Sequence, residues 1–216
     1  MKILVCISRV PDTATKVNIG SDGKTIDETN VKFTLNPYDE FAIEEALQIK
    51  EKGGDSEITA VTVGTADNKD VLRTALAMGV DKAVMIKGEE KPYDSYYVAK
   101  NLADYAKELQ PDLIILGKQS VDFDSLQMPS LLAEMIDYPS VSVVSNLELE
   151  DGKAKAERDI EGGKEILEIE LPALISAQKG LNQPRYPKLP DIMKAKRKPI
   201  EEKDADKTDP RTTVLK

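Results

Sequence analysis

One segment of the chain gathers side chains that bind sugar hydroxyls and phosphates. Residues 117–125 have the sequence Gly-Lys-Gln-Ser-Val-Asp-Phe-Asp-Ser and follow the apolar run 113–116. The carboxylates of Asp122 and Asp124 suit the hydroxyls of a ribose, and backbone amides at the start of a following helix favour an anion. The segment therefore indicates a nucleotide site. An ordinary polar loop between a strand and a helix would have a similar composition, so both interpretations stand.

A second segment has the composition of a docking surface. Residues 189–193 are Leu-Pro-Asp-Ile-Met, with prolines on either side and the basic run 194–198 behind them. Prolines stiffen a chain and so lower the entropy lost on binding. The residues predicted to contact a partner are Leu189, Pro190, Ile192 and Met193. A loop packed on the protein's own core is the alternative.

The composition excludes several classes of chemistry. The 216 residues include no histidine and one cysteine, Cys6. Without histidine the usual Ser-His-Asp and Cys-His catalytic groups cannot form, and one cysteine cannot complete a zinc site. The Gly-rich phosphate loops of standard NTPases and dinucleotide-binding folds are also missing. Cys6 lies in the apolar run 3–7 and is expected to be a buried small hydrophobe rather than a reactive thiol. We predict no catalytic residue and no metal site.

The charge balance bears on partners and location. The chain has 30 basic and 39 acidic residues and a net charge of −9. This disfavours nucleic acid as a partner, because neutralising phosphates requires clustered Lys and Arg. No apolar stretch approaches the ~20 residues of a membrane span, and no signal-peptide pattern precedes the first strand. We expect a cytoplasmic protein, in a bacterial or archaeal cytosol, without membrane insertion.

Strands and helices alternate along the first half of the chain and must position the polar loop. Strands are predicted at residues 2–7, 58–63, 83–86 and 113–116, with helical patterns after them. Asn36 and Pro37 are typical of a helix start, and Arg73 is expected to be a solvated charge on a helix that ends at Gly79. Such alternation predicts a parallel sheet with helices on both faces. Ligands of these folds bind at the carboxyl ends of the strands, where residues 64–67 and 117–127 lie.

The pattern changes in the second half. Residues 141–149, 153–158 and 165–171 alternate as antiparallel strands separated by hairpin turns. Asp22-Gly23 is predicted to turn an earlier hairpin. Prolines prevent a continuous helix beyond residue 181, and the polar end of the chain is typical of an extended or disordered arm. The chain thus divides into an α/β domain at 1–182, a partner-recognition loop and basic segment at 183–200, and a C-terminal arm at 201–216.

The order of several motifs resembles the β subunit of electron transfer flavoproteins through almost the whole chain. The most specific stretches are 73–79, Arg-Thr-Ala-Leu-Ala-Met-Gly, and 182–196, which runs from Asn-Gln-Pro-Arg-Tyr to Leu-Pro-Asp-Ile-Met-Lys-Ala-Lys. Asn36-Pro37-Tyr38-Asp39-Glu40 and Gly117-Lys118-Gln119 also match. The resemblance implies an adenine-nucleotide α-hydrolase-like fold, with a mainly parallel twisted sheet, helices on both faces, antiparallel strands and a C-terminal arm.

The resemblance also implies a role. The chain would be an electron carrier subunit, not an enzyme, paired with a larger α subunit that holds most of an FAD. Electrons would come from acyl-CoA dehydrogenase-type flavoenzymes, which dock through Leu189, and pass to a quinone reductase or another acceptor. A structural nucleotide, usually AMP, would lie in this chain, and Tyr38 would lie near the flavin. The implied cofactor-binding residues are Cys6, Asn36, Tyr38, Asp39, Val63, Gly117, Gln119, Asp122, Asp124, Ser125 and Gln127.

Some features depart from the family pattern. Phe123 replaces the small or acidic residue usual in the nucleotide loop, and Pro129 removes an amide donor. The chain stops at Lys216, short of the family's C-terminal arm, as a shortened member or a truncated chain would. Two alternatives stay open. One is an electron-bifurcating member with a second FAD in the AMP position, and the other is a stand-alone ATP-binding protein of the universal-stress type.

Overall fold

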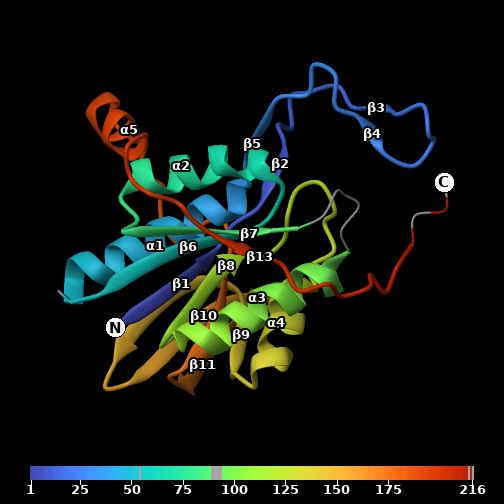
Figure 1. Ribbon diagram of the computed structural model, residues 1–216. Helices are drawn as coiled ribbons and strands as arrows, with labels where there is room; N and C mark the ends of the chain where they lie inside the picture. The colour runs from blue at the N-terminus through green and yellow to red at the C-terminus, as the bar shows by residue number, and fades with distance from the viewer. Residues whose placement is uncertain (54, 89–93, 214, 216) are drawn as a thin grey trace.

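A nine-stranded sheet forms the centre of the computed structural model, which describes residues 1–53, 55–88, 94–213 and 215 (Figure 1). The strands of its parallel part are β1 (Lys2–Cys6), β6 (Glu57–Gly64), β7 (Lys82–Lys87), β8 (Leu113–Gly117), β12 (Ala173–Ala177) and β13 (Glu201–Asp204). Its antiparallel strands are β9 (Ser140–Glu150), β10 (Lys153–Ile160) and β11 (Gly163–Glu170). The order across the sheet is β11-β10-β9-β12-β8-β1-β6-β7-β13. The predicted α/β class, with a mainly parallel sheet and an antiparallel extension, is confirmed.

Helices cover both faces of the sheet. They are α1 (Pro37–Gly53), α2 (Lys69–Met78), α3 (Ser95–Leu109), α4 (Met128–Ile136) and the short α5 (Leu189–Ala195). Figure 1 shows α1 and α2 on one face and α3 and α4 on the other. Successive residues of β1 alternate between two buried clusters, since Ile3 and Val5 pack towards α1 and α2 whereas Leu4 and Cys6 pack towards α3 and α4. Burial on both faces explains why this strand is apolar throughout.

Local signals in the sequence account for α1 and α2. Pro37 opens α1, where its fixed φ suits a helix and its missing amide is not needed. Asp39 and Glu40 in the first turn complement the helix dipole. Helix α2 ends at Gly79 as predicted, and the φ of +130° at this residue favours glycine.

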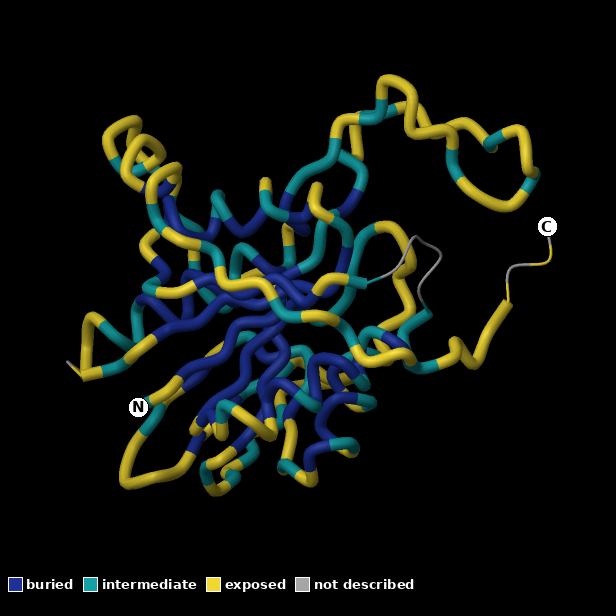
Figure 2. The backbone as a smooth tube through the Cα atoms, viewed as in Figure 1, coloured by how far each residue is buried: buried dark blue, intermediate teal, exposed yellow. Residues whose placement is uncertain are grey.

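The predicted turn at Asp22-Gly23 lies in a hairpin that stands out from the body (Figure 1). Its strands are β3 (Asn18–Ile19) and β4 (Ile26–Asp27), and at its base β2 (Arg9–Pro11) pairs with β5 (Phe33–Leu35). Figure 2 shows that buried backbone is concentrated in the sheet and the surrounding helices, whereas this hairpin is exposed along most of its length.

Two strands of the central sheet, β12 and β13, were not predicted, and neither were the short strands β2 and β5. All five residues of β12 are buried between β8 and β9, yet its sequence Ala-Leu-Ile-Ser-Ala is short and weakly patterned. Residues 201–204, expected to begin an extended or disordered arm, form edge strand β13 beside β7. Glu202 of β13 pairs with Lys69 at 2.6 Å and Lys87 at 2.9 Å. Backbone pairing and these ion pairs order a segment that has no apolar pattern. Residues 214 and 216 of the predicted arm lie outside the described residues.

Across the described parts of the chain, none of the helices combines the length and the apolar character needed to cross a membrane.

Candidate functional site

The strand order reverses beside β1. From β1 the chain moves outward through β6 and β7, and it then returns to the other side of β1 to form β8. The connections after β1 and β8 therefore leave in different directions, and such a reversal creates the crevice in which open α/β sheets bind ligands. Cys6 ends β1 and Gly117 ends β8, so the predicted nucleotide loop starts at this point.

Asp39 connects the ends of these two strands. It lies in the first turn of α1, is 3% exposed, and accepts backbone hydrogen bonds on both carboxylate oxygens. Oδ2 accepts from the Ser8 amide at 2.7 Å, and Oδ1 accepts from the Gly117 amide at 3.0 Å. Burial raises the pKa of Asp39 to about 7, although the hydrogen bond from the Ser8 amide works in the opposite direction. Within the described residues the carboxylate thus bridges two strand ends.

Gly117 permits this close approach of α1 to β8. A Cβ atom at this position would lie 2.5 Å from Oδ1 of Asp39 and 2.7 Å from the Cβ of Tyr38. The next amide, that of Lys118, donates to the carbonyl of Ala177 on β12 at 3.0 Å. The end of β8 is therefore fixed on both sides.

Asn36 holds the first part of the nucleotide loop. Its side chain is buried; Nδ2 donates to the carbonyl of Gln119 at 2.9 Å and Oδ1 accepts from the amide of Val121 at 3.2 Å. The sequence indicates a helix cap at this position, but these two bonds reach a loop more than 80 residues away. Asn36 is thus a support for residues 119–121.

The rest of the loop is exposed and carries the predicted polar groups. The exposed residues are Asp122, Phe123, Asp124, Ser125, Leu126 and Gln127. Gln119 donates to the carboxylate of Asp124, and the amide of Asp124 donates to the carbonyl of Ser120 at 2.9 Å. Gln127 donates to the hydroxyl of Ser95, the first residue of α3, at 2.9 Å. The loop is therefore held at both ends while the Asp122 side chain faces solvent.

Phe123 and Pro129, which depart from the family pattern, have different consequences in the structure. Phe123 is 71% exposed and adds an aromatic ring at the loop tip. Pro129 is buried in the first turn of α4, where a helix does not use the amide, so no helical hydrogen bond is lost.

Cys6, Val63 and Tyr38 surround the same strand ends. Cys6 is 4% exposed and Val63 is 9% exposed, so both residues are buried. Burial raises the pKa of the Cys6 thiol, and the charge of Asp39 adds to this, which agrees with the expected buried, unreactive cysteine. Tyr38 is partly exposed, with Nζ of Lys118 5.0 Å from the centre of its ring.

The predicted docking segment is a helix rather than a loop. Residues 189–195 form α5, and Pro190 lies in its first turn, where a missing amide is tolerated. Leu189 is 73% exposed, Met193 51% and Ile192 37%, whereas Ala195 is the buried residue of the helix. Packing of this segment on the protein's own core, the alternative interpretation, is therefore wrong for its large apolar residues.

Arg73 anchors α5 to α2. Its Nη1 donates to the carbonyl of Ala195 at 2.6 Å and also to the carbonyl of Lys198. Nζ of Lys198 in turn donates to the carbonyl of Val80 at 3.0 Å. The expectation of a solvated Arg73 is wrong, because its partners are carbonyls more than 100 residues away that no local pattern reveals.

Arg185 anchors the chain ahead of α5 to α1. Its guanidinium donates to Glu44 at 2.8 Å and to Glu51 at 2.6 Å. Burial acts to raise the pKa of Glu44, but the hydrogen bonds from Arg185 outweigh it and lower that pKa. The sequence did not identify this support.

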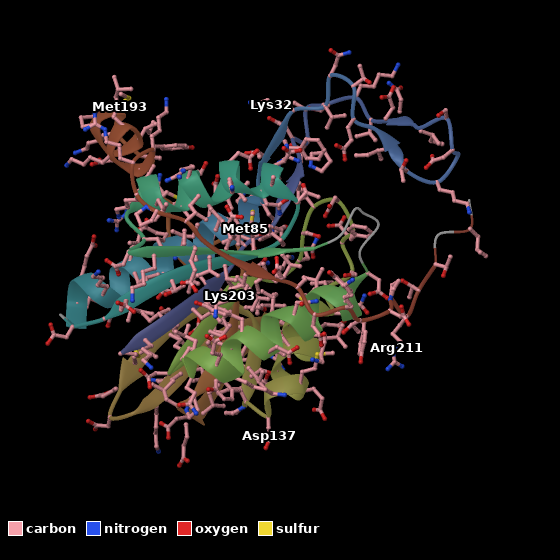
Figure 3. The ribbon with its side chains drawn as sticks, in the orientation of Figure 1. Lys32, Met85, Asp137, Met193, Lys203 and Arg211 are labelled. Atoms are coloured by element: carbon pink, nitrogen blue, oxygen red, sulfur yellow. The ribbon has the colours of Figure 1, made fainter. Side chains whose placement is uncertain are left out.

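The two predicted groups of residues form separate surfaces. Figure 1 shows α5 at one end of the molecule and the loop between β8 and α4 towards the other. Figure 3 places Met193 on the outer side of α5, away from the sheet. A partner docked on α5 would therefore leave the loop between β8 and α4 accessible.

Comparisons with known proteins agree with one another. A protein-family model described as the electron transfer flavoprotein domain matches residues 23–208. The electron transfer flavoprotein subunit beta of Bacillus subtilis is 46% identical over 212 residues, which are 97% of this chain and 81% of that protein. The human protein of that name is 40% identical over 204 residues, covering 93% and 80%. A rice protein (Oryza sativa subsp. japonica), named as the mitochondrial subunit beta, is 43% identical over 203 residues, covering 93% and 80%.

Proposed function

The chain belongs to the electron transfer flavoprotein family as a β subunit, and on that premise we propose that it accepts electrons from acyl-CoA dehydrogenase-type flavoenzymes together with a larger α subunit. A protein of this kind is an electron carrier rather than an enzyme. In the proposal the α subunit holds most of the FAD, and a quinone reductase or another protein is the acceptor. Membership of this family is incompatible with a stand-alone ATP-binding protein.

The observation that carries the proposal is the exposed apolar surface of α5 on a rigid support. Leu189 is 73% exposed, and the helix behind it is fixed by Arg73 and Arg185. A fixed apolar anchor loses little entropy when it enters a pocket on a partner. The basic residues 194, 196 and 197 are exposed beside it and favour an acidic partner surface. Small redox interfaces of this type bind weakly and release quickly.

We propose that AMP binds at the carboxyl ends of β1 and β8. The residues present fit such a ligand: Asp122 and Ser125 are exposed there and offer an acceptor and a donor to ribose hydroxyls. Lys118 offers a positive charge to a phosphate, and Gln119, Asp124 and the backbone around Cys6 and Val63 complete the crevice. AMP bound there supplies no redox chemistry and stabilises the fold.

Tyr38 is proposed to line the flavin site at the subunit boundary. Its ring is partly exposed at the start of α1, beside the crevice. FAD held by the α subunit supplies the redox chemistry. This chain contributes one wall of the flavin site and the docking surface on α5. The same crevice also suits the adenosine part of a second FAD, so an electron-bifurcating member stays the alternative.

The proposal is tested by purifying the chain with its larger subunit and identifying the nucleotides released on denaturation. One FAD and one AMP per heterodimer are expected. Two FAD and no AMP would support the electron-bifurcating alternative. A chain that does not bind the larger subunit, or that carries ATP alone, would contradict the proposal.

The division into an α/β domain at 1–182, a recognition segment at 183–200 and an arm at 201–216 belongs to the proposal, as does a cytosolic location. The rice relative is named as mitochondrial, so the family itself does not determine the compartment.

A further inference from the structure

We propose that the hairpin formed by residues 12–32 is a binding arm for the larger subunit, with Val17, Ile19 and Ile26 as its contact face. This inference rests on the proposed function, which supplies the partner. It adds the surface by which that partner is held.

The hairpin has one apolar face. Val17 and Ile19 are two residues apart on one leg, so their side chains point to the same side of the strand. Ile19 lies directly opposite Ile26 on the other leg. Val17 is 48% exposed and Ile19 is 78% exposed, whereas the alternate position is the polar Asn18. The three side chains therefore form an apolar stripe on one face of the arm.

The arm is ordered by its own hydrogen bonds. At the tip, Asp22 accepts from the amides of Lys24 and Thr25, each at 3.0 Å, and from the Thr25 hydroxyl at 2.8 Å. Lower down, Asp27 accepts from the amide of Thr29 at 3.0 Å. An isolated two-stranded hairpin is only marginally stable in water. These turns reduce the entropy that such an arm would lose on binding.

The base of the arm is fixed to the body. The amide of Asp12 donates to the carbonyl of Lys32 at 2.8 Å, just beyond the pairing of β2 with β5. The guanidinium of Arg9 lies 3.9 Å from the centre of the Phe33 ring, and its Nε is 2.9 Å from Asp70 on α2. The arm thus has a defined direction, and Figure 3 shows Lys32 at the point where it leaves the body.

The position of the arm on the molecule favours the larger subunit as its binding partner. The arm leaves the sheet after β1 and returns through β5 directly into Asn36, Pro37 and Tyr38, the segment proposed to line the flavin. Figure 1 shows that it projects away from the end that carries α5. A partner on the arm would therefore be continuous with the proposed subunit boundary, and a dehydrogenase could occupy α5 at the same time.

The test compares the dissociation constants of the larger subunit for the wild-type chain, Ile19→Asp and Asn30→Asp. Asn30→Asp is the matched control, since it adds the same charge at an exposed residue of the same arm that is not part of the apolar face. We expect Ile19→Asp to weaken binding about tenfold or more, as for a central interface residue, and Asn30→Asp to bind within about twofold of wild type. Replacing residues 13–30 with two glycines should also weaken binding at least about tenfold.

The outcomes separate the two proposals. If Ile19→Asp and the hairpin deletion both bind the larger subunit as tightly as the wild type, the proposed role of the arm is wrong. Equal weakening by Ile19→Asp and Asn30→Asp would also overturn it. The isolated chain could instead self-associate, and Ile19→Asp could abolish this while leaving the affinity for the larger subunit unchanged. The arm would then bind a second copy of this chain, and the proposal would be wrong. A wild-type chain that does not bind the larger subunit would overturn the proposed function itself. Circular dichroism of each variant establishes that it is folded.

Discussion

Replacing Asp39 with Asn should remove a pH dependence of folding that this one carboxyl group creates. Its oxygens accept from the amides of Ser8 and Gly117, and burial raises its pKa to about 7 from an ordinary value of 3.8. An Asn side chain has the same shape but only one acceptor oxygen. One of the two buried amides then loses its acceptor, which costs about 1–3 kcal/mol.

The raised pKa determines the direction of the effect. Because the folded pKa lies above the unfolded one, the native state binds the proton more tightly between about pH 4 and 7. The stability contributed by Asp39 is therefore fully present below its unfolded pKa and is lost as the pH rises through about 7. Between pH 5 and 8 the loss amounts to about 2–3 kcal/mol.

The assay is urea unfolding of the wild-type chain and Asp39→Asn from pH 5 to 8. The stability of the wild-type chain relative to Asp39→Asn should fall by about 2–3 kcal/mol over this range, because the other titrating groups are common to both proteins. Asp67→Asn, which removes the same charge from an exposed residue, is the matched control and should keep the wild-type pH dependence. A difference between wild type and Asp39→Asn that stays constant within about 0.5 kcal/mol would refute the reasoning.

Three further substitutions test the site and the docking helix. Leu189→Ala should slow electron transfer from an acyl-CoA dehydrogenase about tenfold in stopped-flow measurements, without loss of flavin; an unchanged rate would contradict docking through α5. Gly117→Ala should destabilise the fold by about 1–3 kcal/mol in thermal unfolding, because its Cβ would lie 2.5 Å from Asp39 Oδ1; unchanged stability would mean that α1 and β8 separate easily. Asp122→Ala should lower the AMP retained after gel filtration, while the Tm of the nucleotide-free chain stays the same, since this side chain is exposed. Full retention would show that backbone contacts alone hold the nucleotide.

Much of the fold could be predicted because its signals are local. The apolar runs of β1 and β8, the proline that opens α1 and the glycine that ends α2 each act within a few residues. The two strands of the central sheet that were not predicted lack such signals. Buried β12 is five residues long, and β13 consists of charged residues that only the neighbouring β7 and its lysines hold in place.

The structure gives structural roles to some of the residues predicted to bind a cofactor. The family resemblance implies that Asn36, Asp39 and Gly117 bind a cofactor, and that role remains a proposal. The structure adds that Asn36 supports the nucleotide loop and that Asp39 bridges two strands. The expected and observed roles differ most for Arg73, which was expected to be a solvated charge and instead anchors α5.

By itself, the sequence determined the alternation of strands and helices, the chemistry available to the chain and, through its motifs, the family. These depend on short-range periodicity, turn residues and composition. All three can be recognised without knowing which distant segments of the chain pack against each element. The tertiary structure alone decided which distant groups meet. Asp39 reaches the amide of Gly117 across 78 positions, and Arg73 reaches the carbonyl of Ala195 across 122. Both contacts exist because the strand order places β8 beside β1 and the chain returns over α2, and no local pattern encodes either arrangement.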